Sequence, residues 1–233
     1  ISTDYAFAAL KSDGSVVTWG SSTYGGDSSS VESSLSSGVS SIVSNSLAFA
    51  ALKTDGSVVT WGHSSYGGDS SAVASSLSSG VSSVVSNESS FAALKADGSV
   101  VTWGDSSFGG DSSSISSDLT GVSSIVGSEL AFAALKEDGS VVTWGHSSYG
   151  GDSSSISSDL TGVSSIVSTG SAFAAIKSDG SVVTWGYAVR GGDSSAVEND
   201  LTAKTLHTYT IENNDVPNNE PTGDILITGT TKA

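Results

Sequence analysis

The sequence contains no cysteine and no methionine among its 233 residues, and it has only two prolines. The missing cysteines exclude disulfide bonds and any chemistry that needs a cysteine thiolate. Basic residues are scarce, since 8 lysines and arginines stand against 24 acidic residues, for a formal net charge of -16. Such a chain repels phosphate backbones and anionic lipids, so we expect no nucleic-acid partner. No apolar run approaches the ~18 residues of a membrane span, so no membrane insertion is expected.

Charged residues make up only 14% of the chain, and serine and glycine fill much of the polar fraction. The composition is therefore not that of a disordered polyelectrolyte. A chain of this length can bury a sizeable core. Because it starts at Ile1 and lacks methionine, we expect it to be a piece of a longer or processed protein.

One unit of 41–42 residues recurs five times and dominates the sequence. Its most recognisable part is a Val-Val-Thr-Trp-Gly segment. The five tryptophans are Trp19, Trp61, Trp103, Trp144 and Trp185. Because the spacing changes by a single residue, we expect each unit to occupy an equivalent place in one assembly.

Each unit contains a predicted β-hairpin. In the first unit, Ala6–Lys11 and Ser15–Trp19 are rich in apolar, β-branched and aromatic residues, which favour strands. Asp13-Gly14 stands between them, and Asp-Gly is a strong hairpin signal because glycine adopts the positive φ of a tight turn. The same dipeptide recurs at Asp55-Gly56, Asp97-Gly98, Asp138-Gly139 and Asp179-Gly180.

Two further segments belong to each unit. Val39–Val43 is apolar and β-branched, which predicts a third strand. The serine-rich segment between Gly26 and Gly38 contains Val31 and Leu35. It fits either a short outer strand or a single helical turn, and the sequence does not separate the two.

The expected fold is all-β, a five-bladed β-propeller built from five antiparallel repeats of 41–42 residues. Segments such as AFAAL and VVTW carry apolar side chains on both faces, which indicates sheets covered on both sides. A β-solenoid also stacks its strands, but they run parallel, and the Asp-Gly reversals contradict that arrangement. A ring of blades covers both end faces that an open stack leaves exposed.

The closure of this ring is open to two interpretations. The first unit lacks most of the third strand, because Ile1 corresponds to Val43. The segment Lys204–Ile211 alternates polar and apolar residues, so we expect it to pair beside Tyr5–Leu10 and close the ring. Alternatively, the five units come from a ring with more blades.

The unit resembles the RCC1-type propeller repeat. The resemblance rests on Ala9–Gly20 (ALKSDGSVVTWG), followed by Gly25-Gly26. The unit is shorter than usual, occurs five rather than seven times, and has Gly-Gly-Asp-Ser in place of Gly-Gln-Leu-Gly. The resemblance implies a propeller over residues 1–211 that presents surfaces to partners. The family's role in nucleotide exchange on small GTPases is not carried over, because a fold does not transfer a function.

Residues 212–233 are expected to be a linker and the start of a following module. Val216–Ala233 contains both prolines and then the strand-like DILITGT. It resembles the linker and first strand of the Ig-like repeats of giant bacterial surface adhesins. This resemblance implies a module of a large secreted or cell-surface bacterial protein, located outside the cell and flanked by other modules of the same chain.

Variation between the units indicates which side chains are free to bind a ligand. The residue after Trp-Gly changes from unit to unit, so packing does not fix it and we expect it at the rim. An aromatic residue before Gly-Gly lies close by in four units, which predicts a multivalent surface. The candidate ligand-binding residues are Tyr24, Tyr66, Phe108, Tyr149, His63 and His146. The alternative is that these side chains only fill the loops.

An aspartate follows Gly-Gly in every unit. These candidate metal ligands are Asp27, Asp69, Asp111, Asp152 and Asp193. Their carboxylates could bind Ca²⁺, but each could equally accept hydrogen bonds from the backbone of the following serines. Because the spacing of an EF-hand is missing, the turn interpretation is favoured, and no cofactor other than Ca²⁺ comes into question. The five tryptophans are expected to pack between blades rather than bind sugars.

Catalysis has no support in the sequence. There is no Gly-x-Ser-x-Gly elbow, phosphate loop or His-x-x-x-His motif, and His63 and His146 occupy equivalent places in different units. The first hypothesis is a non-catalytic extracellular binding or adhesion module for a cell-surface protein or glycan. The second is a lectin-like propeller with one sugar site per blade, and the third is a structural spacer.

Overall fold

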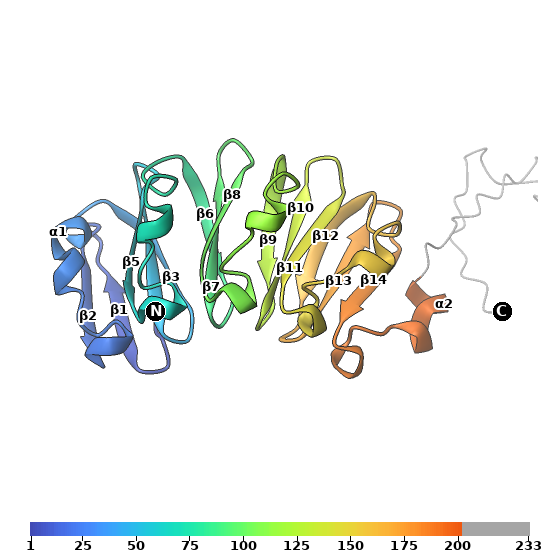
Figure 1. Ribbon diagram of the computed structural model, residues 1–233, viewed down its shortest axis with the longest axis horizontal. Helices are drawn as coiled ribbons and strands as arrows, with labels where there is room; N and C mark the ends of the chain where they lie inside the picture. The colour runs from blue at the N-terminus through green and yellow to red at the C-terminus, as the bar shows by residue number, and fades with distance from the viewer. Residues whose placement is uncertain (202–233) are drawn as a thin grey trace, which may run out of the picture.

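The computed structural model describes residues 1–201, which form five small antiparallel sheets arranged in a row (Figure 1). The first sheet consists of β1 (Ala6–Leu10) and β2 (Val16–Gly20). The other sheets are β3 (Val39–Ser44), β4 (Ala48–Lys53) and β5 (Val58–Gly62); β6 (Val81–Ser86), β7 (Ser90–Lys95) and β8 (Val100–Gly104); β9 (Val122–Gly127), β10 (Ala131–Lys136) and β11 (Val141–Gly145); and β12 (Val163–Ser168), β13 (Ala172–Lys177) and β14 (Val182–Gly186). The predicted hairpins and third strands are therefore confirmed.

Short helices follow the last strand of each sheet. They are η1 (Ser22–Tyr24), η2 (Ser29–Val31) and α1 (Glu32–Leu35); η3 (Ser64–Tyr66) and η4 (Ser71–Val73); η5 (Ser106–Phe108) and η6 (Ser113–Ile115); η7 (Ser147–Tyr149) and η8 (Ser154–Ile156); and η9 (Ala188–Arg190), η10 (Ser195–Val197) and α2 (Glu198–Leu201). The serine-rich segment is thus helical, and its leucine is buried. Within residues 1–201, no helix has the length and apolar character needed to cross a membrane.

Each hairpin turn is closed by its aspartate. In the first unit, Asp13 Oδ1 accepts hydrogen bonds from the Ser15 hydroxyl at 2.6 Å and the Ser15 backbone N–H at 2.9 Å. These bonds, with a smaller contribution from Lys11, lower the pKa of the Asp13 carboxyl below its ordinary value. Gly14 has a φ of 78°, which other residues rarely adopt. The hydrogen bonds of the aspartate and the positive φ of the glycine together explain why Asp-Gly predicts this hairpin turn.

The hydrophobic core lies between successive sheets rather than within one. At the first junction, Ala6, Ala8 and Leu35 of the first unit pack against Phe49 and Trp61 of the second. The indole N–H of each buried tryptophan also donates a hydrogen bond to a glycine carbonyl of the preceding unit. These pairs are Trp61–Gly25, Trp103–Gly67, Trp144–Gly109 and Trp185–Gly150, at 3.0–3.2 Å. Every unit therefore depends on its neighbour for burial.

The accepting glycine is required at this place for two reasons. Gly25 has a φ of +99°, and it ends the 3-10 helix η1. A Cβ atom at Gly25 would also lie 2.6 Å from ring carbons of Phe49. Both the backbone conformation and the close approach of the aromatic ring therefore exclude a larger residue.

The prediction that all five tryptophans pack between blades is wrong for Trp19. Its side chain is 51% exposed, whereas the other four are 3–5% exposed. Trp19 lies on the first sheet, and the described residues place no unit in front of it. A closed ring is not seen in residues 1–201, because the first and last sheets lie at opposite ends of the row (Figure 1). The expected closing strand Lys204–Ile211 and the expected linker 212–233 lie outside the described residues.

We expect Trp103→Ala to lower the free energy of unfolding by about 3–5 kcal/mol, because it removes a buried indole and leaves a cavity. Trp19→Ala makes the same change at an equivalent position that is half exposed, so its effect should be about half of this or less. Urea titration followed by far-UV circular dichroism measures both. Equal losses for the two variants would contradict the assignment of Trp19 to an open face.

Candidate binding site

The candidate aromatic side chains are placed by the short helices and by a buried polar residue. Tyr66 ends helix η3, and its carbonyl oxygen accepts a hydrogen bond from Asn45 Nδ2 at 2.6 Å. Asn45 in turn accepts hydrogen bonds from the backbone N–H groups of Leu47 and Ala48, at the start of β4. Asn87 holds the carbonyl of Phe108 in the same way at 2.5 Å. The loop that carries each aromatic ring is thereby fixed to the turn before the central strand.

The six predicted ligand-binding residues form two groups rather than one site per unit. His63 stacks on Tyr24 with ring centroids 5.9 Å apart and meets Tyr66 edge-on at 5.3 Å. Phe108, His146 and Tyr149 repeat this arrangement, with distances of 6.0 and 5.3 Å. Asp105 occupies the place of the histidine between the two groups. The rings are partly buried against each other, so they both fill the loops and leave faces accessible.

A column of acidic residues runs beside these rings, held by backbone hydrogen bonds between units. The Asp4 N–H donates to Ser46 O at 3.0 Å, the Ser46 N–H to Glu88 O at 3.3 Å, and the Glu88 N–H to Glu129 O at 2.9 Å. Asp4, Glu88 and Glu129 thus follow one another along the row. Removal from water raises the pKa of the Glu88 carboxyl, and the negative charges of Glu129 and Asp4 raise it further.

The aromatic rings and the acidic column meet at a small cavity of about 270 Å³. Its lining residues are Asp4, Tyr5, Tyr24, Ser46, Leu47, Tyr66, Glu88 and Ser89. We call Asp4, Tyr5, Tyr24, Tyr66 and Glu88 the aromatic–acidic edge. Among residues 1–201, no lysine or arginine lines this cavity, and the lysines at the strand ends lie beside the hairpin turns, away from it. Tyrosine faces combined with carboxylates can bind a cationic group.

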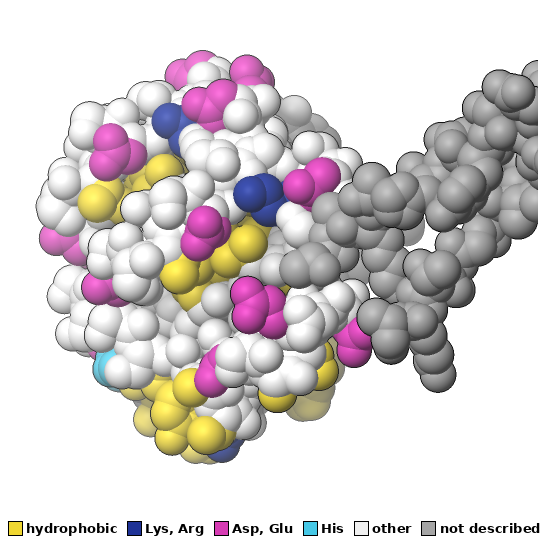
Figure 2. Space-filling model, turned by 90° about the vertical axis from the view of Figure 1, so that its right-hand side faces the viewer, with side chains coloured by type: hydrophobic (Ala, Val, Ile, Leu, Met, Phe, Trp, Pro, Cys, Tyr) yellow, Lys and Arg dark blue, Asp and Glu magenta, His cyan; other side chains and the backbone are white. Residues whose placement is uncertain are grey.

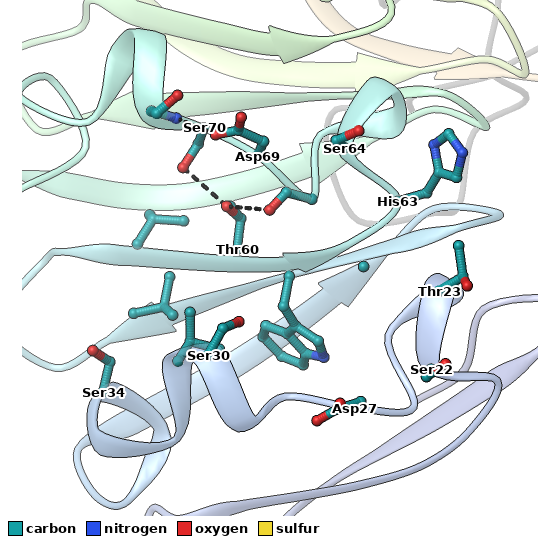
Figure 3. A pocket seen from close by; sticks show the side chains of 17 residues that line it. Ser22, Thr23, Asp27, Ser30, Ser34, Thr60, His63, Ser64, Asp69 and Ser70 are labelled. Atoms are coloured by element: carbon teal, nitrogen blue, oxygen red, sulfur yellow. Dashed lines mark hydrogen bonds between the residues drawn. The ribbon is translucent and has the colours of Figure 1, made fainter.

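A larger groove of about 820 Å³ separates the first and second units (Figure 3). Hydroxyl-bearing residues dominate its walls, and Figure 3 shows Thr60 bonded to Ser70 on one side. The predicted residues His63, Asp27 and Asp69 also line it. Trp61 contributes to the wall, but its ring is only 3% exposed and offers no free face for a sugar to stack on.

The five Gly-Gly-Asp aspartates close their own loops. Each carboxylate accepts a hydrogen bond of 2.9 Å from the backbone N–H of the serine two residues later. These bonds lower the pKa of each carboxyl. Within residues 1–201, no three acidic or histidine side chains come together as metal ligands. The geometry agrees with the turn interpretation, and Ca²⁺ binding stays a prediction.

Sequence reasoning missed the acidic column. Asp4, Glu88 and Glu129 occupy a position that is serine in the second unit and glycine in the fifth, Ser46 and Gly170. A comparison of the five units identified the variable residue after Trp-Gly. The same comparison at the turn before each central strand would have identified the acidic residues. Their proximity to the aromatic rings, however, depends on how the units stack.

No protein-family model and no curated protein matches the sequence. Solved structures with a similar fold include Prp20p from Saccharomyces cerevisiae, with 15% identity, a TM-score of 0.51, and coverage of 79% of this chain and 56% of that one. Yeast RCC1 (Prp20) bound to Kap60 has 16% identity and a TM-score of 0.51, and the match covers 81% of this chain and 55% of that one. The ectodomain of the Physcomitrella patens receptor kinase CR4 has 17% identity and a TM-score of 0.49, and the match covers 82% of this chain and 52% of that one. The chain spans little more than half the length of these proteins, and residues 1–201 have a propeller-like fold similar to that of RCC1.

Glu88→Gln should raise the melting temperature at neutral pH, because it removes the cost of taking a charged carboxylate out of water and the repulsion from Glu129 and Asp4. A raised pKa means that the folded state binds the Glu88 proton more tightly than the unfolded state. The unfavourable contribution of Glu88 therefore appears as the pH rises through its folded pKa and is absent below its ordinary pKa. Because the side chain is solvent-accessible, the gain should stay within about 1 kcal/mol and shrink in high salt.

Differential scanning calorimetry at neutral and acidic pH measures this gain. Glu137→Gln is the matched control, since it removes the same charge at an exposed hairpin turn. An equal rise for both variants would assign the effect to net charge and contradict the column.

Proposed function

We propose that this chain is a non-catalytic binding module whose aromatic–acidic edge holds a positively charged segment of a protein partner. The observation that carries the proposal is the cavity in which Tyr24 and Tyr66 lie beside Asp4 and Glu88. The pKa of Glu88 is raised first by removal of its carboxyl from water and then by repulsion from the carboxylates of Glu129 and Asp4, and among residues 1–201 no lysine or arginine lines the cavity. A lysine or arginine side chain would relieve that repulsion and rest on the tyrosine faces. The net charge of -16 would also speed the approach of a basic partner.

The fold supports a protein partner in general terms. Prp20p has been characterised for its binding to Gsp1p and histones, and yeast RCC1 has been crystallised with Kap60. At 15–16% identity those particular partners do not transfer to this chain. What transfers to the proposal is the use of an RCC1-like propeller as a surface for other proteins.

The surroundings of the two histidines support a non-catalytic role. His63 and His146 are each packed between aromatic rings in separate units. Within the described residues, the Nδ1 atom of each is buried without a hydrogen-bond partner.

We place this module outside the cell, in a large bacterial surface protein that adheres to a cell-surface protein. The proposal draws on the serine- and glycine-rich, acidic composition and on the resemblance of residues 216–233 to adhesin repeats. The aromatic–acidic edge would then supply the contact, and the repeated units would supply the spacing.

A lectin-like function is the second candidate, and the groove between the first two units favours it. Hydroxyls and the carboxylates of Asp27 and Asp69 could form hydrogen bonds with a neutral sugar (Figure 3). The buried face of Trp61 speaks against it, since sugar sites usually offer an open aromatic ring. A spacer without any ligand is the third possibility.

A fluorescent lysine-rich peptide tests the first proposal. Its affinity should fall about three- to tenfold in Glu88→Gln, because one charge contact is lost at a partly enclosed site. Glu137→Gln changes the net charge equally at a hairpin turn and should have little effect. Fluorescence anisotropy measures both affinities. If the two variants weaken binding equally, the peptide is held by non-specific attraction to the net charge rather than by the aromatic–acidic edge.

Tyr66→Ala combined with Tyr149→Ala should also weaken binding without unfolding the domain, since both rings are only partly buried. Circular dichroism checks the fold of the double variant. An unchanged affinity would show that Tyr66 does not contribute to binding at the aromatic–acidic edge and that Tyr149 does not contribute in the equivalent group around His146. Binding on a glycan array would instead favour the lectin, and loss of cell adhesion on deletion with a silent array would favour the adhesin. If neither glycan binding nor a loss of adhesion is observed, the structural spacer is the remaining hypothesis.

A further inference from the structure

The cavity at the aromatic–acidic edge is lined by aromatic rings that are inclined to one another. The ring of His63 lies nearly parallel to that of Tyr24, with an interplanar angle of 18°, and nearly perpendicular to that of Tyr66, at 85°. The planes of Tyr24 and Tyr66 are therefore steeply inclined to each other. Tyr5 packs on Tyr24 with ring centroids 4.8 Å apart and adds a third ring to the lining. The three tyrosines thus line the cavity from more than one direction.

Two carboxylates complete this lining, and they come from different units. Asp4 belongs to the turn before β1, and Glu88 belongs to the turn before β7. The backbone hydrogen bonds from Asp4 to Ser46 and from Ser46 to Glu88 hold these turns side by side. A cation in the cavity would be attracted both by the carboxylates and by the negative faces of the tyrosine rings.

Tyr5 distinguishes this cavity from its equivalents in the row. Within residues 1–201, the other units have Leu47, Ser89, Leu130 and Ser171 at the same position. The group around His146 therefore contains Phe108 and Tyr149 but has Ser89 where this cavity has Tyr5. Since leucine and serine serve the fold in the other units, packing does not require a tyrosine here.

The size and lining of the cavity favour one kind of cation. Its volume of about 270 Å³ is below the roughly 300–1,000 Å³ of sites for drug-sized molecules, so it suits the head of a single side chain. An unmodified lysine ammonium is compact and strongly hydrated, and aromatic walls replace its water poorly. Methylation keeps the charge, removes N–H donors and adds apolar surface that the rings can cover. A methylated ammonium therefore matches a lining of rings and carboxylates best.

We propose that this cavity recognises a methylated lysine of the protein partner, with the ammonium held among the three tyrosine rings and its charge balanced by Asp4 and Glu88. The inference rests on the proposed function and specifies the chemistry of the bound cation. The acidic surface favours a protein source over a phosphocholine headgroup, because the net charge of -16 repels the phosphate. Figure 2 shows acidic side chains spread over one end of the molecule, with fewer basic ones between them.

A series of peptides tests the proposal on the full chain. The fluorescent lysine-rich peptide is prepared with its central lysine unmodified, monomethylated, dimethylated or trimethylated, and with a neutral isostere in which carbon replaces the trimethylated nitrogen. The affinity should rise about five- to twentyfold from the unmodified to the trimethylated peptide. The isostere should lose most of this gain, because it has the same shape without the charge. Fluorescence anisotropy measures each affinity.

Variants of the tyrosines assign the gain to the cavity. Tyr66→Leu should abolish most of it, and Tyr66→Phe should restore it, since Phe108 already occupies the equivalent position in the third unit. Tyr5→Leu should reduce the gain, and Leu47 shows that the fold accepts leucine there. Tyr187→Leu is the matched control, because it removes a tyrosine that lies outside the cavity. Circular dichroism checks that each variant is folded.

Equal affinities for the unmodified and trimethylated peptides, or for the trimethylated peptide and its isostere, would overturn the proposal. A gain that survives Tyr66→Leu would also overturn it, since the methylated group would then be bound elsewhere. The proposed function has a separate readout, because binding of the unmodified peptide would still weaken in Glu88→Gln.

Competition experiments identify the source of the cation. Free choline carries the same methylated ammonium and should displace the trimethylated peptide, whereas phosphocholine should be a poorer competitor because of its phosphate. Stronger competition by phosphocholine than by choline would assign the cavity to a headgroup and overturn the choice of a protein partner.

Discussion

The packing of one unit's phenylalanine and tryptophan on the glycine loop of the preceding unit is the interaction on which the structure depends. It buries the largest side chains, satisfies the indole N–H, and fixes the left-handed glycine that ends each 3-10 helix. Because Tyr24 directly precedes Gly25, the same contact also places the aromatic ring of the candidate site. Core and binding surface are therefore one arrangement here, and a loop could not move without opening a junction.

Much of this arrangement could be predicted because it uses local chemistry. Asp13-Gly14 specifies a tight turn by itself, and the apolar stretches on either side specify paired strands. The repeat then predicts stacking, since equal units bury their faces on one another. The sequence left the segment from Gly26 to Gly38 undecided, because a four-residue helix such as α1 is too short to show a helical period.

The rest depends on position in the row, which identical units cannot encode. Trp19 has the same neighbours in sequence as Trp61, yet Trp19 is half exposed and Trp61 is buried, because within residues 1–201 only Trp61 packs against another unit. The grouping of Tyr24, His63 and Tyr66 likewise depends on contacts between units. The acidic column was missed for the same reason, since Asp4 and Glu88 are far apart along the chain and come together only through the ladder of backbone hydrogen bonds.

The dependence of each unit on its neighbours also has a consequence for how the protein opens. In a linear array, the stability of a unit is its own contribution plus that of each neighbour it touches. Within residues 1–201 the third unit packs against both the second and the fourth, so its amides should exchange with solvent more slowly than they would with one neighbour removed. Unfolding would then proceed unit by unit as a sequence of small steps. Under mechanical tension such a chain would lengthen gradually, unit after unit, instead of giving way in one event.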